Sequence, residues 1–148
     1  MTIPRWLLEI FWLEDRALSK LSGGRWALPN SSGGVVRTLF LHTEGRRTGQ
    51  KRRNGLYYVE DGPNLVIVAS NAGRDEDPSW WLNLQAHPDT EVEVGTEVRT
   101  VRARQADPAE ARRLYARFVE SLPQYRDYRR RTTREIPVVI LEPRPRLS

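Results

Sequence analysis

The amino-acid sequence predicts a mainly β protein with added helices, in which about six antiparallel strands form a barrel-like sheet with helices at its ends. Short apolar or alternating segments recur along the chain, and most are joined by brief turns, which is the pattern of β-hairpins. Segments with helical periodicity are inserted between these strands or precede them. The 148 residues suffice for one domain with a sizeable core.

The first 34 residues are expected to form an arm separate from the main body. Apolar residues at helical spacing predict an amphipathic helix over residues 3–13. Charges interrupt it, and it is shorter than the ~20 apolar residues that span a bilayer. It could lie on a membrane surface, cover a pocket or pack on its own domain. Residues 22–24 and 29–34 predict a flexible connector, so the domain comprises residues 35–148.

The strands of the main body are expected from β-branched, apolar or alternating segments. Asp61-Gly-Pro-Asn64 has strong turn chemistry and predicts a hairpin, as does Gly95-Thr96. The strand after the first of these turns is apolar on both faces and is therefore expected to be central. The strands are predicted over residues 35–43, 56–60, 65–70, 90–94, 97–102 and 136–141.

A short helix is predicted over residues 77–87. Asp77 is suited to cap its start, and Pro78 suits its first position. Trp80 and Trp81 are adjacent, so we expect one to face the core or a ligand and the other to point elsewhere.

Two further helices are predicted in the C-terminal third. The first opens at residue 107 with a capping-box-like sequence that pairs Asp107 with Glu110. The second covers residues 123–131 and carries Tyr125 and Tyr128. One face of the first helix is apolar at four-residue spacing, through Leu114, Phe118 and Leu122.

A basic loop is expected between the first two strands, over residues 43–54. Gly45 and Gly49 permit a tight loop, and the segment from Arg46 to Arg53 carries five cations and one hydroxyl. Such a loop could hold a phosphate or a run of carboxylates. Taken alone, it could equally be a solvated hairpin.

Composition narrows the chemistry further. The chain has no cysteine, which excludes disulfides and thiolate chemistry and suits the cytoplasm. His42 and His87 are too few for a histidine-rich metal site, and no metal is expected. All but two of the 24 basic residues are arginine and the net charge is +5, which favours an anionic partner. Nucleic acid is not expected, because the basic loop lacks aromatic residues for base stacking.

Five motifs occur in a recognisable order: Gly45-Arg-Arg-Thr-Gly-Gln with Arg52 and Asn54, Ala69-Ser70 with Gly73, Pro78-Ser-Trp-Trp-Leu-Asn-Leu84, Tyr125-Arg-Asp-Tyr128, and Ile136-Pro137. In this the chain resembles the deazaflavin-dependent nitroreductases, quinone- and nitro-reducing enzymes that use reduced coenzyme F420. The resemblance covers roughly residues 35–143. It implies the split β-barrel fold shared with pyridoxamine-oxidase-like flavoproteins.

The resemblance also implies a cofactor site. The family's cofactor has a flat deazaflavin and a long arm bearing a phosphate and glutamates. Ser70, Tyr125 and Tyr128 match substrate-side positions, and Tyr125 is the one catalytic candidate, as a hydrogen-bond or proton donor to the acceptor. The cofactor-binding positions carried over are Arg46, Arg47, Thr48, Arg52, Asn54, Gly55, Leu56, Tyr57, Val68, Ala69, Ser70, Asn71, Ser79, Trp80 and Asn83.

The expected activity is hydride transfer from F420H2 to a quinone, a nitroaromatic or an activated alkene. Members of the family often have proline at the positions of Lys51 and Gly55, lysine at that of Asn71 and an aromatic residue at that of Leu122. The difference at Leu122 leaves open whether bulky nitroaromatics are reduced. A non-catalytic F420 carrier and an FMN-binding relative remain alternatives. A homodimer is compatible with the sequence, and the expected location is cytoplasmic, with a peripheral contact of residues 3–13 on the inner face of the plasma membrane as a further option.

Overall fold

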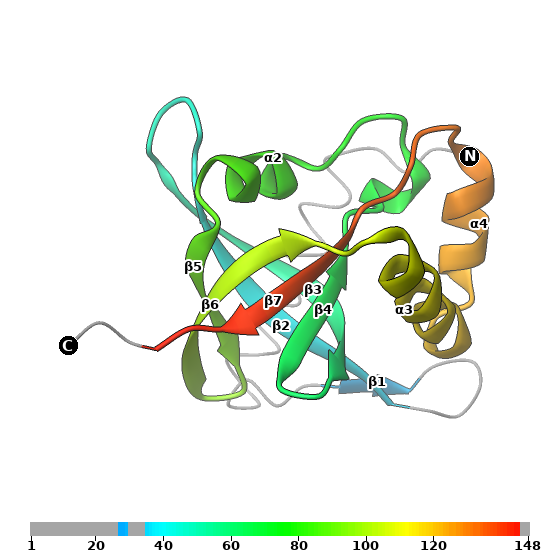
Figure 1. Ribbon diagram of the computed structural model, residues 1–148, viewed down its shortest axis with the longest axis horizontal. Coiled ribbons are helices and arrows are strands. Elements are labelled where there is room, and N and C mark those ends of the chain that lie inside the picture. Colours follow the sequence, from blue (N-terminus) through cyan, green and yellow to red (C-terminus); the bar gives the residue numbers. More distant parts are fainter. Residues whose placement is uncertain (1–26, 30–34, 146–148) are drawn as a thin grey trace.

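The computed structural model describes residues 27–29 and 35–145, and its strands form a closed antiparallel barrel (Figure 1). The strand order is β1-β2-β3-β4-β7-β6-β5, and a β2–β5 pairing closes the ring. The predicted fold of about six antiparallel strands is therefore confirmed. The strands are β1 (Ala27–Pro29), β2 (Val35–Glu44), β3 (Lys51–Asp61), β4 (Asn64–Val68), β5 (Asp89–Val94), β6 (Glu97–Gln105) and β7 (Val138–Pro143).

Strand β1 was not predicted. It lies within the segment expected to be an arm and connector, and it pairs antiparallel with the start of β2, where Leu28 opposes Val36. The amphipathic helix predicted over residues 3–13 lies outside the described residues. Within the described part of the chain, no helix has the length and apolar content needed to cross a membrane.

The predicted basic loop of residues 43–54 was too long. The β2–β3 pairing runs up to Glu44 opposite Lys51, so the loop itself comprises residues 45–50. Residues 51–54 extend β3 because they contain no glycine or proline that would interrupt a strand. Their backbone N–H and C=O groups form hydrogen bonds with β2, and this pairing does not depend on which side chains they carry. Gly45 N donates to Gln50 O at 2.8 Å, and Gly49, with φ of 69°, donates to Gly45 O at 2.8 Å.

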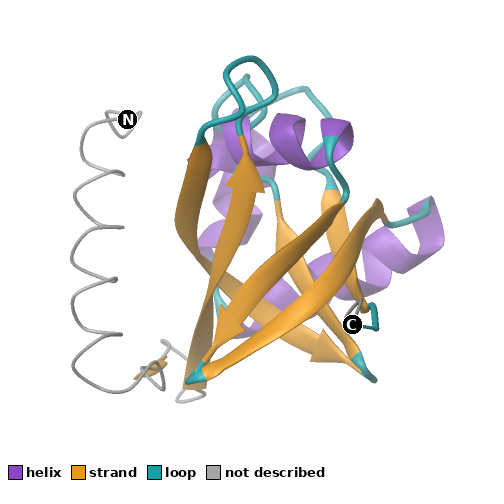
Figure 2. Ribbon diagram, turned by 90° about the vertical axis from the view of Figure 1, so that its left-hand side faces the viewer, coloured by secondary structure: helices purple, strands orange, loops and turns teal. Residues whose placement is uncertain are grey.

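Helix α2 (Ser79–Ala86) lies at one end of the barrel (Figures 1 and 2), and its buried side chains belong to the interior cluster. Trp80, Trp81 and Leu84 belong to the same buried cluster as Leu39 and Ile67 of the barrel strands. The prediction that only one of the two tryptophans points inward was wrong. Successive residues of a helix diverge by only about 100°, so a helix embedded over a barrel end can bury both.

The predicted cap of α2 was also wrong. Pro78 is the N-cap and makes no side-chain cap hydrogen bond, while Asp77 pairs with Arg134 instead, with 2.8 Å between Oδ1 and Nη1. An aspartate that already has a fork-shaped cationic partner is held away from the helix start. The residue following proline, rather than proline itself, therefore begins the helix.

Helices α3 (Pro108–Ser121) and α4 (Gln124–Arg131) cover the outer face of β4 and β7. The predicted capping box is present: Glu110 N donates to Asp107 Oδ1, and Asp107 N donates to Glu110 Oε1. The apolar face predicted for this helix is buried against the outer strand face. That second buried cluster contains Val66, Val68, Leu114, Tyr115, Phe118, Leu122, Tyr125, Val138 and Ile140.

The barrel closes between β2 and β5 through polar as well as backbone contacts. Glu93 Oε2 accepts hydrogen bonds from Arg53 Nε at 2.6 Å and lies 2.8 Å from His42 Nε2. The Arg53 guanidinium also lies 3.8 Å from the centroid of the Phe40 ring. The hydrogen bond from Arg53, followed by that to His42, lowers the pKa of the Glu93 carboxyl against an opposing effect of burial. This network gives His42 and Arg53 structural partners at the seam.

Candidate functional site

The β2–β3 loop is attached to α2 through Asn83. Arg46 uses both its backbone N and its Nη1 to donate to Asn83 Oδ1, each at 3.1 Å. Asn83 Nδ2 in turn lies 3.4 Å from Thr43 Oγ1, and the Asn83 residue is only 4% exposed. Two residues predicted to bind the cofactor, Arg46 and Asn83, are thus brought together from segments 37 positions apart.

Several cations near this junction have no carboxylate partner among the described residues. Arg47, Lys51 and Arg52 are exposed, and the ion pairs found within residues 35–145 do not include them. Arg53 differs, because Glu93 holds it at the barrel seam. Unpaired guanidinium groups beside a tight loop are suited to binding a phosphate or carboxylate. The Thr48 hydroxyl accepts from Gln50 N at 3.2 Å and keeps its own proton available to donate.

A second group of predicted residues meets around Tyr125 of α4. The Ser70 side chain, just beyond the end of β4, is a polar neighbour of the Tyr125 phenol, and the two residues are 6% and 7% exposed. The Tyr125 ring centroid lies 5.1 Å from that of Tyr128 and 5.2 Å from that of Phe118. Tyr115 donates its hydroxyl to the backbone carbonyl of Tyr125. These contacts fix the ring of Tyr125 against the residue predicted to line the deazaflavin.

The environment of Tyr125 disfavours its anionic form. Burial raises the pKa of the Tyr125 phenol well above its ordinary value of about 10, and the neighbouring tyrosines act in the same direction. The polar contact with Ser70 opposes the shift but is the smallest of the causes. Tyr125 therefore retains its proton at neutral pH. As a neutral phenol it can donate a hydrogen bond through its hydroxyl proton and accept one through its oxygen lone pairs.

The predicted residues on β3 and β4 do not all face the same way, because side chains alternate along a strand. Leu56 and Ala69 pack with the cluster inside the barrel, whereas Tyr57 and Val68 pack with the outer cluster that contains Tyr125. A flat ligand on the outer side of these strands would meet the side chains of Tyr57 and Val68. Ala69 could contact it only through backbone atoms.

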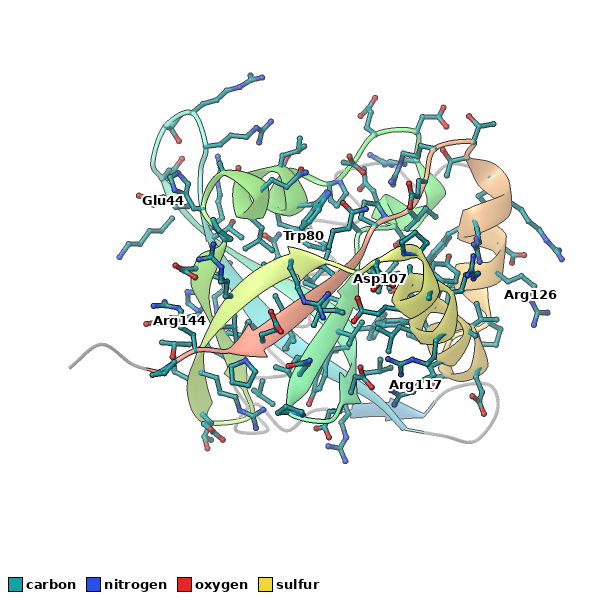
Figure 3. All side chains as sticks on the ribbon, in the orientation of Figure 1. Glu44, Trp80, Asp107, Arg117, Arg126 and Arg144 are labelled. Atoms are coloured by element: carbon teal, nitrogen blue, oxygen red, sulfur yellow. The ribbon has the colours of Figure 1, made fainter. Side chains whose placement is uncertain are left out.

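The remaining predicted cofactor residues divide in a similar way. Asn54 is half-buried opposite Leu41, and Gly55 is buried opposite Phe40. Ser79 is exposed at the start of α2, while Trp80 is buried between α2 and the barrel (Figure 3). Asn71 donates from Nδ2 to Glu76 O at 3.0 Å, so its side chain stabilises its own loop.

Arg134 was missed by the sequence-based reasoning. It lies between α4 and β7, and it donates to the carbonyls of Ala69, Ser70 and Arg74 as well as to Asp77. It therefore holds the segment that carries Ser70 and leads into α2. In a chain with so many arginines, no signal in the sequence distinguishes this one.

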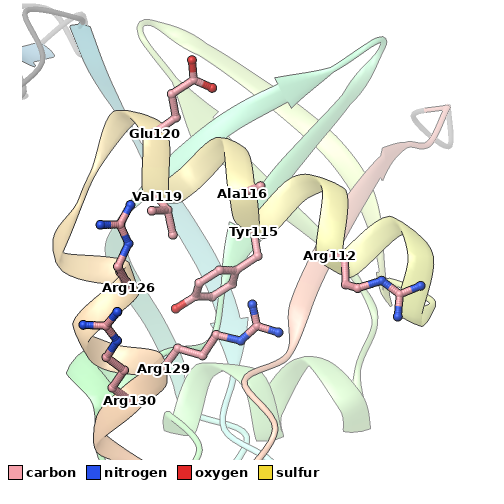
Figure 4. Close-up of a pocket in the computed structure, with 8 residues that line it drawn as sticks. All are labelled: Arg112, Tyr115, Ala116, Val119, Glu120, Arg126, Arg129 and Arg130. Carbon is pink, nitrogen blue, oxygen red and sulfur yellow. The ribbon is translucent and has the colours of Figure 1, made fainter.

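One pocket lies away from the predicted residues, in a groove of about 580 Å³ between α3 and α4 (Figure 4). Arg112, Arg126, Arg129 and Arg130 contribute to its lining, and the Arg129 guanidinium lies 5.0 Å from the centroid of the Tyr115 ring. Cations in the last turn of α4 also complement the partial negative charge at a helix C-terminus, which accounts for much of this cluster. A smaller pocket of about 360 Å³ includes Lys51 and Arg52 in its lining.

The arrangement fits a long anionic cofactor with a flat end. One end of the barrel carries unpaired cations and an anchored loop, and the protonated Tyr125 of α4 packs on the outer face of β4 with Ser70 as a polar neighbour. Among the described residues, no group of three or more His, Cys, Asp and Glu side chains is placed to hold a metal ion. The unpaired cations are suited to binding an anion.

Comparison with known proteins identifies the family. The family model for F420H(2)-dependent quinone reductase matches residues 23–143. A relative described as an F420H(2)-dependent quinone reductase, from Mycobacterium tuberculosis (strain ATCC 25618 / H37Rv), is 36% identical over 151 residues, which covers 95% of this chain and 98% of the relative. The chain belongs to the F420H(2)-dependent quinone reductase family, and its class is that of an oxidoreductase that uses coenzyme F420.

Solved structures agree with this assignment. An F420-H2 dependent reductase is 34% identical, with a TM-score of 0.65 over 71% of this chain and 93% of its own. A structure described as a domain-swapped dimer is 29% identical, with a TM-score of 0.67 over 90% of this chain and 99% of its own. The fold alone is shared with a pyridoxamine 5'-phosphate oxidase-like protein from Listeria innocua, at 12% identity and a TM-score of 0.53 over 90% of this chain and 94% of its own. The predicted split β-barrel is confirmed.

Proposed function

We propose that this chain reduces quinones with F420H2, binding the anionic arm of the cofactor at the β2–β3 loop and its ring system beside Ser70. The observation that carries the proposal is the pairing of an anchored, unneutralised cation cluster around Arg46 with the buried polar neighbours Ser70 and Tyr125. Arg47 and Thr48 complete the cluster on the loop. Arg52, at the start of β3, is a further candidate for the arm.

Bound F420H2 supplies the hydride, so the protein's contribution is to bind, orient and exclude water. Tyr125 keeps its proton on Oη at neutral pH, and its ring is held by packing against Phe118 and Tyr128. It can donate a hydrogen bond or a proton to the oxygen of the acceptor as charge develops there, a modest contribution typical of a positioned general acid. The packed rings of Tyr125 and Tyr128 provide an apolar wall against which an aromatic acceptor can stack.

The acceptor range is part of the proposal. Nitroaromatics and activated alkenes need the same hydride and a similar hydrogen bond, so we include them with quinones. Leu122 is buried beside the Tyr125 cluster, where the family often has an aromatic residue. The aliphatic side chain removes one stacking surface, and compact quinones are therefore the preferred acceptors.

A homodimer and a peripheral membrane contact are each proposed from a single observation. The relative described as a domain-swapped dimer supports a homodimer for this chain. A peripheral membrane contact of residues 3–13 rests only on the amphipathic pattern of a segment outside the described residues.

An assay with menadione tests the proposed function. Purified protein mixed with F420H2 and menadione should oxidise the cofactor with saturation in both substrates, whereas FMNH2 or NADH should not replace F420H2. A protein that binds F420 without turnover would be a carrier. Tight FMN binding with no response to F420 would show that the chain is a flavoprotein of the same fold.

A further inference from the structure

The guanidinium of Arg134 is anchored to four residues of the segment 69–77. Its side chain is 15% exposed, and hydrogen bonds leave from Nε, Nη1 and Nη2. Nε donates to Arg74 O at 2.9 Å and Nη1 to Asp77 Oδ1 at 2.8 Å. Nη2 donates to Ser70 O at 2.9 Å and to Ala69 O at 3.2 Å. A guanidinium satisfies so many acceptors at once because its N–H groups form a planar fork.

The acceptors lie on a segment whose backbone is strained. Asn71 and Ala72 have backbone φ angles of 47° and 55°, in the left-handed region that residues other than glycine rarely adopt. Gly73 follows with φ of 79°, and a Cβ there would lie 2.9 Å from the Tyr128 Cα. Such a turn persists only when surrounding contacts over-determine it. The bonds from Arg134 to the carbonyls on both sides of the turn provide that restraint.

The same segment connects the two halves of the site. Ser70 at its start is a buried polar neighbour of the Tyr125 phenol, and Asp77 at its end precedes the helix that carries Asn83. A second contact from the neighbourhood of Arg134 acts on the middle of the segment, where Thr132 Oγ1 lies 2.9 Å from Asp75 Oδ1. Arg134 is paired with Asp77, so unlike Arg47 it is not available to bind an anion.

We propose that Arg134 is a positioning residue, which holds residues 69–77 so that Ser70 and Tyr125 stay aligned for hydride transfer. It acts through the backbone of this segment and touches neither cofactor nor substrate. This inference rests on the proposed function for its kinetic consequence. Its structural consequence, rigidity of residues 69–77, holds in the protein without any ligand.

The test uses Arg134→Lys, which keeps the charge but cannot form the fork. Arg113→Lys is the matched control, because Arg113 donates a similar fork to Asp61, from Nη1 and Nη2 at 3.1 Å each, on the exposed face between α3 and β3. Hydrogen–deuterium exchange of the ligand-free protein should be at least about tenfold faster in residues 70–77 of R134K, since losing part of a charged hydrogen-bond set weakens local closure by that order. R113K should leave those residues as in the wild type.

Kinetics with F420H2 and menadione supply the second measurement. In R134K, kcat should fall by about tenfold or more, while the Kd for F420 changes by less than about threefold because the cation cluster is intact. Unchanged exchange in residues 70–77 would overturn the proposal, and so would faster exchange with an unchanged kcat. Absence of turnover in the wild type would instead count against the proposed function, and the exchange result would still decide whether Arg134 restrains the segment.

Discussion

Arg46 donates two hydrogen bonds to a single oxygen of Asn83: its backbone N and its Nη1 both lie 3.1 Å from Asn83 Oδ1. This relationship links the loop between β2 and β3 to the helix that closes the barrel. It also orients Asn83, whose amide nitrogen lies 3.4 Å from the Thr43 hydroxyl. The proposed anion-binding loop is therefore held by a buried amide rather than left as a free hairpin.

Replacement of Asn83 by alanine should release the loop. A buried hydrogen-bonded amide is lost, which costs about 1–3 kcal/mol of stability, and Arg46 loses its anchor. The Kd for F420 should rise by about tenfold, and in a double-mutant cycle N83A and R46A should be strongly non-additive. Isothermal titration of the four proteins measures this. Additive effects would show that Arg46 binds the cofactor independently of Asn83.

Removal of the Tyr125 hydroxyl tests the donor role. Tyr125→Phe keeps the packed ring, so the protein should remain folded, and kcat with menadione should fall by about tenfold or more, within the range of general acid catalysis. Ser70→Ala should reproduce part of that loss, because Ser70 is a polar neighbour of the same hydroxyl. Full turnover of Y125F with every acceptor tried would assign Tyr125 a packing role only.

The pH dependence of turnover should lack a tyrosine ionisation near pH 10. Burial raises the pKa of Tyr125 above its unfolded value of about 10, so the protonated form persists in the folded protein. The associated stability is fully present below pH 10 and is lost as the pH rises toward the folded pKa. Rate measurements from pH 7 to 10, with circular dichroism as the control for folding, should be flat. A fall in kcat centred below pH 10 in the folded protein, absent from Y125F, would contradict this.

Acid stability should depend on Glu110. The Arg104 hydrogen bond, followed by that from the Asp107 backbone, lowers the pKa of the Glu110 carboxyl from 4.5 to about 2. A carboxyl with a depressed folded pKa stabilises the protein above its unfolded pKa, and that contribution is lost as the pH falls from about 4.5 toward 2. Urea denaturation of Glu110→Gln should show lower stability than the wild type at pH 7 and a smaller difference at pH 3. A constant difference across this range would exclude the ionised carboxylate as the cause.

Local sequence signals predicted the barrel well because most of its strands are joined by short hairpins, whose turn chemistry is local. The capping box of Asp107 and Glu110 was predicted for the same reason. Asp77 shows the limit of local rules: it suited a helix cap, but Arg134, 57 positions away, binds it instead. The burial of both Trp80 and Trp81 likewise depends on where α2 sits over the barrel. Such long-range choices have no signature in a single chain.

The site was predicted through its residue types, while its organisation came from the structure. Arg46 and Asn83 were both expected to contact the cofactor, but their contact with each other was not foreseen. Ser70 and Tyr125 likewise prove to be buried neighbours. Alternation along β3 and β4 could have been applied from the sequence, and it separates Tyr57 and Val68 from Leu56 and Ala69.

The most direct measurement is a binding titration with F420 and with FMN, followed by intrinsic tryptophan fluorescence, on the wild type and on Arg46→Ala/Arg47→Ala. Arg99→Ala/Arg102→Ala, on β6, is the control for lost charge. The account predicts saturable F420 binding that the loop variant weakens by about a hundredfold, since each lost charged contact is worth about 1.4 kcal/mol or more. FMN, with one phosphate, should bind much more weakly. Equal F420 affinity in the loop variant and the wild type would contradict the account.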